Sequence, residues 1–339
     1  MEPLNYPLPT DTPLTEKLCY GIGPKPITLS WSRLSDWVKC NYRVKLIHQG
    51  KKSKLSNARN FLAGKVADLA MRKALEDAPK DPTGRLLSIS KEDMLSYVPE
   101  LWDKSRTRPP EDDPRADGYL EKNSILKWNG TDPAEDQKKI LENINKSLTN
   151  LHPILESKLI GRRFIPEFRP KEMPVIGIPG PSGETCYIRL FLAVDCAVQL
   201  SEDPTNPDGL GEWGLYDLKT TSTVEYLEKT LPQLVFYDIA FHALTGKRPI
   251  EHALWTPLVN PTIRSIHVTD EHRRMVLNWI ISYCHGVWAG KDGFTNDETN
   301  CYTCSTRAAC PKITPPTTKN DQGLSVVHFG DSSGRKLHG

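Results

Sequence analysis

The sequence lacks several features that would place it in large protein classes. It contains no run of about 18 apolar residues, which a membrane-spanning helix requires. Its first residues have neither the basic segment nor the apolar core of a secretory signal. It also lacks the Gly-x4-Gly-Lys-(Ser/Thr) loop of nucleotide-driven motors. We therefore expect a cytoplasmic, intracellular protein without a membrane partner, which is not itself an ATP-driven motor.

An excess of charge of one sign is also absent, since 44 Lys and Arg residues face 42 Asp and Glu residues. The net charge therefore indicates neither a nucleic-acid partner nor its absence, and any phosphate-binding surface must be local. What the sequence does contain is eight cysteines in 339 residues. In a reducing compartment these are expected to be thiols or metal ligands rather than disulfides.

The order of periodic segments predicts an α/β (α+β) fold with a central mixed β-sheet flanked by helices. Helical periodicity covers residues 30–40, 58–77, 134–160, 231–245 and 269–289, and strand-like alternation covers 162–169, 186–200, 213–219, 251–258 and 263–268. Between the second and third helices, residues 78–133 are rich in proline, aspartate and arginine, and 106–115 are expected to form an exposed loop. Residues 202–211 are expected to form a turn that makes a hairpin of the strands on either side.

These segments divide the chain into five expected parts. They are an extended arm (1–28), an N-terminal helical region (29–160), a core (161–290), a cysteine segment (291–314) and a flexible tail (315–339).

Two acidic strands of the core carry the strongest signal for chemistry. Asp195 stands in the apolar run Phe-Leu-Ala-Val-Asp, and Asp217 and Lys219 stand in Tyr-Asp-Leu-Lys on the next strand. Residues i and i+2 of a strand share a face, so Asp217 and Lys219 should project together. Two carboxylates and a backbone carbonyl, here that of Leu218, suit Mg²⁺ or Mn²⁺. Such an ion makes water more acidic and offsets phosphodiester charge, and a lysine beside it can orient the attacking water.

The alternative is a surface hairpin with solvated Asp and Lys side chains. Three features favour a site instead. Asp195 lies in an apolar context, Glu167 lies on a preceding strand, and Gln233 and Tyr237 follow on the next helix with the i, i+4 spacing of one face.

In this arrangement the chain resembles the RecB-like branch of the PD-(D/E)XK nucleases. That family has an Asp on one strand, (Asp/Glu)-x-Lys on the next and a Gln-x-x-x-Tyr helix, which here match Asp195, Asp217 to Lys219, and Gln233 to Tyr237. The family also has an upstream Gly-x-x-x-His helix whose His binds metal. Here the helix reads Gly64 to Asp68, so an Asp stands at the metal-ligand position. The Gly that often precedes the first Asp by three residues is Leu192 here.

The resemblance implies a restriction-endonuclease-like core and a Mg²⁺- or Mn²⁺-dependent DNA exonuclease acting on single-stranded or free DNA ends. It implies products with a 5′-phosphate and a 3′-hydroxyl, a role in DNA recombination, repair or replication, and a helicase or recombination partner. A catalytically impaired DNA-binding protein of the same fold is the alternative, and the Asp in place of His is its main support.

A second motif, Cys301-x2-Cys304-x5-Cys310, places three thiols close together in the sequence. Three ligands do not close a structural metal site, so a fourth must come from elsewhere, with Cys19, Cys40, Cys186, Cys196 and Cys284 as candidates. The segment around Cys40 is similar to the N-terminal cysteine segment of the iron–sulfur members: AddB-type nuclease domains, CRISPR-adaptation nucleases and exonuclease V. This resemblance implies a 4Fe-4S cluster on Cys40, Cys301, Cys304 and Cys310. Zinc in a regulatory protein, or unliganded thiols, are the alternatives.

Basic residues near the first helix, interleaved with Trp31, Trp37 and Tyr42, are candidates for binding single-stranded DNA. The alternative is a solvated helix with aromatic anchors in the core. The residues that we assign to DNA contact are Arg33, Arg43, Arg162 and Arg163.

Overall fold

A computed structural model of the chain describes residues 28–48, 59–106, 133–180, 185–201, 211–220, 230–258 and 262–288, with single positions and short pairs between 301 and 326. The chain forms two compact units. One combines Met1–Trp31 with Ser56–Ile281, and the other combines Ser32–Leu55 with Ser282–Gly339.

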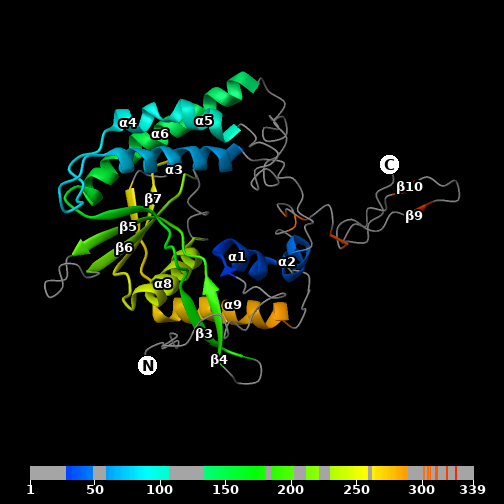
Figure 1. Cartoon of the computed structure of the whole chain (residues 1–339). Coiled ribbons are helices and arrows are strands. Elements are labelled where there is room, and N and C mark those ends of the chain that lie inside the picture. Colours follow the sequence, from blue (N-terminus) through cyan, green and yellow to red (C-terminus); the bar gives the residue numbers. More distant parts are fainter. Residues whose placement is uncertain are drawn as a thin grey trace. The chain divides into compact units, whose positions relative to one another are not determined.

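The larger unit is built on a five-stranded sheet with the order β2-β5-β6-β7-β8 (Figure 1). Its strands are β2 (Phe164–Phe168), β5 (Val194–Ser201), β6 (Glu212–Leu218), β7 (Glu251–Thr256) and β8 (Thr262–Ser265). The pairing of β6 with β7 is parallel and the other pairings are antiparallel. Parallel neighbours require a crossover, which helix α8 (Leu231–Thr245) supplies. The predicted mixed sheet and the antiparallel hairpin of β5 and β6 are confirmed.

Four helices cover one face of this sheet (Figure 1). They are α3 (Arg59–Asp77), α4 (Lys91–Ser96), α5 (Val98–Arg106) and α6 (Pro133–Leu159). Buried side chains such as Val66 and Leu148 pack with Tyr216 and Trp255 of the sheet, and these two rings stack 5.1 Å apart. Helices α4 and α5 were not predicted, because a proline- and aspartate-rich composition hides short helices. Ser90 nevertheless caps α4 by accepting a hydrogen bond from the Asp93 amide.

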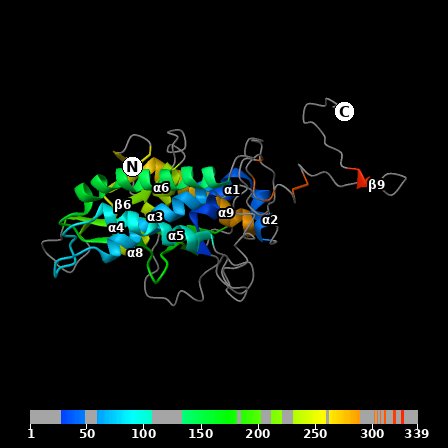
Figure 2. The ribbon, with the colours of Figure 1, turned by 90° about the horizontal axis from the view of Figure 1, so that it is seen from above.

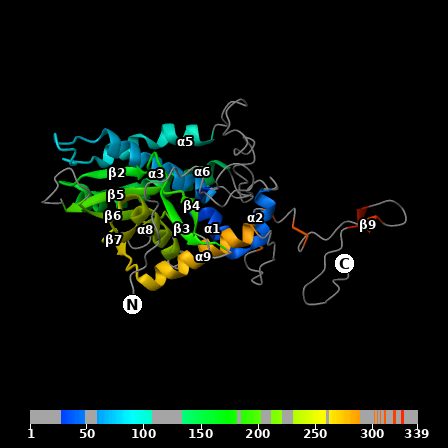
Figure 3. The ribbon, with the colours of Figure 1, turned by 60° about the horizontal axis from the view of Figure 1, so that its bottom comes forward.

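Helices α8 and α9 (Asp270–Trp288) lie on the other side of the sheet (Figure 3). Helix α8 is apolar on all sides and is buried from Leu234 to Phe241, with Gly246 in the left-handed conformation ending it. A three-stranded sheet joins β1 (Thr28–Leu29), β4 (Thr185–Leu190) and β3 (Val175–Pro179).

The prediction of one strand over residues 186–200 is wrong. The run divides into β4 and β5, which belong to different sheets. Between them the Phe191 amide donates to the Leu29 carbonyl. An apolar run looks the same in sequence whether the chain continues straight or passes from one sheet to another. Strand β3 was also missed, because it is short and contains Gly177 and Pro179.

The smaller unit contains most of α1 (Trp31–Lys39), α2 (Asn41–His48), the end of α9 and the short strands β9 (Thr318–Lys319) and β10 (Ser325–Val326), as Figure 2 shows in part. Trp37 anchors it. The indole is 5% exposed, packs edge-on against Tyr283 at 5.5 Å, and reaches Ser282 Oγ at 3.5 Å. A Cβ on Gly286 would lie 2.2 Å from this ring, so glycine is required there. Trp37 is thus a core residue of the smaller unit, which is the alternative that we set against a role in stacking on DNA bases.

Several sequence expectations fall outside the described residues. These are most of the arm (1–27), the loop at 107–115, the turn at 202–210 and most of the tail from 315 onwards. Within the described residues, no helix combines the length and apolarity needed to cross a membrane.

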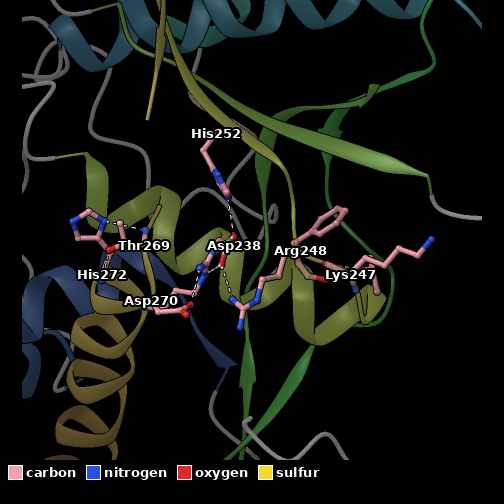
Figure 4. Close-up of polar contacts among 10 residues, drawn as sticks. Asp238, Lys247, Arg248, His252, Thr269, Asp270 and His272 are labelled. Carbon is pink, nitrogen blue, oxygen red and sulfur yellow. Dashed lines mark hydrogen bonds and ion pairs between the residues drawn. The ribbon is translucent and has the colours of Figure 1, made fainter. Parts of the chain in front are cut away.

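A buried carboxylate fixes α8 to its neighbours (Figure 4). Asp238 is fully buried and accepts two hydrogen bonds from Arg273 of α9, at 2.6 and 3.1 Å. It also pairs with His252 Nε2 at 2.9 Å, at the start of β7, and with Arg248 at 3.4 Å. Burial alone raises the pKa of Asp238, but the hydrogen bonds from His252 and Arg273 outweigh it, so the pKa lies below its ordinary value.

We predict that Asp238→Asn lowers the free energy of unfolding by about 3 kcal/mol, because it removes the buried counter-charge of Arg273 and leaves the guanidinium its pair with the more exposed Asp270. Since the folded-state pKa is depressed, the wild-type advantage should be complete above the ordinary Asp pKa and disappear as pH falls through the folded value. Urea denaturation at several pH values measures this. The control Glu142→Gln alters an exposed carboxylate of α6 and should change little. Equal stabilities of Asp238→Asn and wild type at neutral pH would contradict the prediction.

Candidate active site

The sheet register aligns three carboxylates on neighbouring strands. The pairing of Cys196 with Tyr216 places Asp195 opposite Asp217. The pairs on either side of Glu167, Pro166 with Cys196 and Phe168 with Val194, place Glu167 opposite Asp195. Residues that are directly opposite in antiparallel strands share a face. The row therefore runs from Glu167 through Asp195 to Asp217.

Polar contacts join Asp217 to the predicted lysine and to helix α8. Lys219 forms an ion pair with Asp217 Oδ2, and its ammonium also donates to Gln233 Oε1 at 3.2 Å. The Gln233 amide donates to Asp217 Oδ1 at 3.2 Å and contacts the Tyr237 hydroxyl at 2.9 Å. The expectation that Asp217 and Lys219 project together, with Gln233 and Tyr237 on one helix face, is confirmed. Gln233 thus fixes the lysine and the carboxylate at once.

Asp195 lies among like charges. Its Oδ2 accepts a 2.7 Å hydrogen bond from the Leu218 amide. Burial raises its pKa well above the ordinary value, and the charges of Asp217 and Asp68 raise it further, against the lowering effects of Lys219 and the Leu218 amide. Burial likewise raises the pKa of the Tyr237 hydroxyl, with Asp217 contributing. The ionised form of Asp195 is therefore unfavourable by itself, and a bound cation would stabilise it.

Helix α3 brings a fourth carboxylate and an arginine to the row. Arg72 forms ion pairs with Asp68, one turn earlier on α3, and with Glu167 of β2. Burial raises the pKa of Asp68, and the charges of Glu167 and Asp217 add to this, while Arg72 opposes it. Sequence reasoning missed Arg72, although the Asp-x-x-x-Arg spacing of an ion pair on one helix face was readable.

Gly64 allows α3 to approach the end of β6 closely. A Cβ at this position would lie 2.9 Å from Oγ1 of Thr220, the residue after Lys219. The glycine of the Gly64 to Asp68 motif therefore has a steric reason, because it lets the helix that carries Asp68 pack beside the segment that carries Lys219.

The donor set fits a divalent cation in its chemistry. Asp68 Oδ1 is buried without a hydrogen-bond partner. Arg72 pairs with Asp68 and Glu167, and Lys219 pairs with Asp217, so these two cations are outnumbered by the four carboxylates Asp68, Glu167, Asp195 and Asp217. Oxygen ligands of this kind are those that Mg²⁺ and Mn²⁺ prefer. The described residues nevertheless contain no group of three or more His, Cys, Asp or Glu side chains already gathered around a cation position. Ligation would therefore require these side chains to close together.

The structure places the other predicted residues less centrally. The Leu218 amide contacts Asp195, and the ligand role of the Leu218 carbonyl stays a prediction. Arg43 pairs with Asp36 at 3.1 Å, and Arg33 lies beside Tyr283, both within the smaller unit. Their contribution to DNA binding stays a prediction.

Arg162 donates to the Lys158 carbonyl, and Arg163 pairs through its backbone with Arg85, both before β2 begins. The structure does not bring Arg162 or Arg163 into contact with Glu167.

The four predicted cluster cysteines all belong to the smaller unit. Cys40 follows α1, and Cys301, Cys304 and Cys310 come from the C-terminal segment. All four are half-buried and free of disulfides, and Cys304 Sγ lies 3.3 Å from Thr306 Oγ1. The four thiols are not among any preformed metal group of the described residues. Cys196 and Cys284 are buried core residues as expected. The Cys186 side chain and Cys19 lie outside the described part.

We predict that Asp195→Asn stabilises the protein at neutral pH without added metal, by on the order of 1 kcal/mol, because it removes a carboxylate held against like charges. Since the folded-state pKa is raised, the cost of Asp195 should appear as pH rises above the ordinary Asp value, and the two proteins should converge in acid. Thermal unfolding over a pH series with a chelator checks this. Mg²⁺ or Mn²⁺ should then stabilise the wild type more than the variant. A variant less stable than wild type at neutral pH would sink the prediction.

Comparison with known proteins leaves the family open. No protein-family model matches the chain, and no curated protein sequence matches it. The site is defined by its own side chains: three carboxylates aligned across a mixed sheet, a lysine held by a glutamine, and a helix that adds Asp68 and Arg72.

Proposed function

We propose that this chain is a Mg²⁺- or Mn²⁺-dependent deoxyribonuclease that hydrolyses phosphodiester bonds as an exonuclease at single-stranded DNA ends. Its core would be of the PD-(D/E)XK type. The observation that carries the proposal is the connected group of Asp217, Lys219, Gln233 and Tyr237 beside Asp195. A solvated surface hairpin would not bury Asp217, which is 3% exposed, or join its Asp-x-Lys pair to a buried helix.

The residues divide the chemistry among themselves. Asp195 and Asp217, with Asp68 and the Leu218 carbonyl, would hold the divalent ion, which supplies Lewis-acid chemistry by making water more acidic and by offsetting phosphodiester charge. Lys219 can orient the attacking water or neutralise the charge that develops on the phosphorus oxygens. Gln233 holds the Lys219 ammonium by its Oε1 and Asp217 by its amide, so both face the same point. Attack by water would leave a 5′-phosphate and a 3′-hydroxyl.

We further propose that Cys40, Cys301, Cys304 and Cys310 bind a 4Fe-4S cluster in the smaller unit. Support comes from their common membership of a compact unit that combines the early segment Ser32–Leu55 with the distant segment Ser282–Gly339. Four thiolates are the usual ligands of such a cluster, and zinc is the rival for the same donors. The cluster would fasten the segment after α1 to the segment after α9.

One observation favours a second candidate, a DNA-binding protein of this fold without cleavage. Asp68 is engaged by Arg72 and stands where the resembling family has a metal-binding His. In either case the family resemblance suggests a helicase or recombination protein as the partner.

The nuclease proposal predicts that Asp217→Ala and Lys219→Ala each reduce cleavage of end-labelled single-stranded DNA by about a hundredfold or more in Mg²⁺ or Mn²⁺. Each variant removes one member of the connected group. Glu142→Gln and Lys146→Ala, which alter exposed residues of α6, are the matched controls and should cleave like wild type. Cleavage unchanged in either active-site variant would remove the assignment. DNA binding by the wild type without cleavage in any divalent metal would favour the second candidate.

The cluster proposal predicts that protein purified anaerobically is brown, with a broad visible absorption band and four irons per chain. Cys301→Ser or Cys310→Ser should lose the band, whereas Cys196→Ala, which alters a buried cysteine of the larger unit, should keep it. Absorption and metal analysis of one preparation decide the matter. A colourless protein with one zinc per chain would replace the cluster with a zinc site.

A further inference from the structure

The guanidinium of Arg72 uses its two terminal nitrogens but not its Nε. Its Nη2 meets Asp68 Oδ2 and its Nη1 meets Glu167 Oε2, whereas Nε is buried without a hydrogen-bond partner. Nε and Nη2 form the edge of a guanidinium that binds carboxylate or phosphate through two parallel hydrogen bonds. Asp68 therefore uses one of the two donors on the edge that is best suited to an anion.

Glu167 holds the opposite side of the same group in an unusual way. Its backbone φ is +46°, which makes it the one non-glycine residue with positive φ among the described residues. This conformation is strained for a residue with a side chain. The Glu167 side chain is 45% exposed while Arg72 is 18% exposed, so the pair spans from the surface to the carboxylate row. Glu167 is thus a second carboxylate partner for Arg72, separate from Asp68.

Asp68 is the carboxylate for which Arg72 and a cation at the row would compete. Its Oδ2 contacts Arg72 and its Oδ1 is buried without a hydrogen-bond partner. The side chain also lies within electrostatic range of Asp217 and Asp195. A divalent cation bound by Asp195 and Asp217 would attract both Asp68 oxygens and repel the guanidinium.

We propose that Arg72 is a displaceable counter-ion: a divalent cation takes Asp68 from it, and the freed Nε/Nη2 edge, still anchored through Nη1 on Glu167, binds a phosphate of the DNA strand. The inference rests on the proposed nuclease function and adds to it a residue that links metal binding to substrate binding. Arg72 would add its positive charge to that of Lys219 at a site that otherwise presents carboxylates to an anionic substrate.

The first test measures Mn²⁺ affinity by titration calorimetry on the full chain. Arg72→Met keeps the length and apolar stem of the side chain but removes the competing charge, so it should tighten Mn²⁺ binding about tenfold. If Arg72 merely held Asp68 in place, the same variant would weaken Mn²⁺ binding. Arg264→Met, at an exposed position of β8, is the matched control and should bind Mn²⁺ like wild type.

The second test measures binding of single-stranded DNA in a Lys219→Ala background, where we expect cleavage to be at least about a hundredfold slower, with Mn²⁺ present. Adding Arg72→Met should weaken binding several-fold and reduce the dependence of log Kd on log salt by about 0.7, the value for one phosphate contact on a single strand. Tighter metal binding together with weaker DNA binding is the combination that a purely structural role would not produce.

Glu167 gives a further check through a double-mutant cycle. If Glu167 acts on DNA through Arg72, then Glu167→Gln should weaken DNA binding in the Lys219→Ala background and have no further effect once Arg72→Met is present.

The outcomes separate the two proposals. Wild-type protein that binds Mn²⁺ and cleaves DNA, with metal affinity unchanged or weakened in Arg72→Met, overturns the role of Arg72 and leaves the nuclease standing. Wild type and Arg72→Met that both bind no Mn²⁺ overturn the nuclease and this inference together. Mn²⁺ binding that is measurable only in Arg72→Met would support the proposal, because it would mean that Arg72 competes strongly with the cation for Asp68.

Discussion

The register between β5 and its two neighbours is the constraint on which the candidate site depends. It is set by the opposite side of the strand, where Cys196 and Val198 are buried against the α3 and α6 layer. A slip of one residue would move Cys196 and Val198 to the face that now carries Asp195, and it would bury the Asp195 carboxylate in the apolar core. Each slipped pairing is therefore less stable than the observed one. The alignment of Glu167, Asp195 and Asp217 is thus a by-product of core packing. Charged groups that repel one another are held together because apolar groups behind them have only one good arrangement.

Helix α8 connects this strained row to the rest of the larger unit. Gln233 and Tyr237 face the row, while Asp238, the next residue, is held by α9 and β7. A helix that is buried on all sides has little to fix its rotation through hydrophobicity alone, because each orientation buries similar apolar area. The Asp238 ion pairs are directional and select one rotation. The position of the Lys219 ammonium, set through Gln233, therefore traces back to a carboxylate on the far side of the same helix.

Local pattern was enough to predict the hairpin of β5 and β6, the α8 helix, and the shared faces of Asp217 with Lys219 and of Gln233 with Tyr237, because each depends on short spacings. The contact between these two pairs joins residues 14 and 16 positions apart and does not follow from such spacings. Pattern failed where the answer depended on partners distant in sequence. The break between β4 and β5 follows from which sheet each strand joins, and Arg72 gains its meaning only through Glu167, which lies 95 positions later in the chain. Asp238 looked like any acidic residue in a helix until His252 and Arg273 were placed beside it.

The smaller unit has a consequence for how the chain is made. Its two parts, Ser32–Leu55 and Ser282–Gly339, are separated by 226 residues that all belong to the larger unit. During synthesis Trp37 leaves the ribosome long before Tyr283 and Gly286, between which its ring packs. The usual order, in which N-terminal units fold first, is therefore reversed: the larger unit can complete its sheet while the early helix still waits for its partner. A chain that ended before Tyr283 would therefore lack the residues that cover the Trp37 indole, although it would still contain every carboxylate of the row.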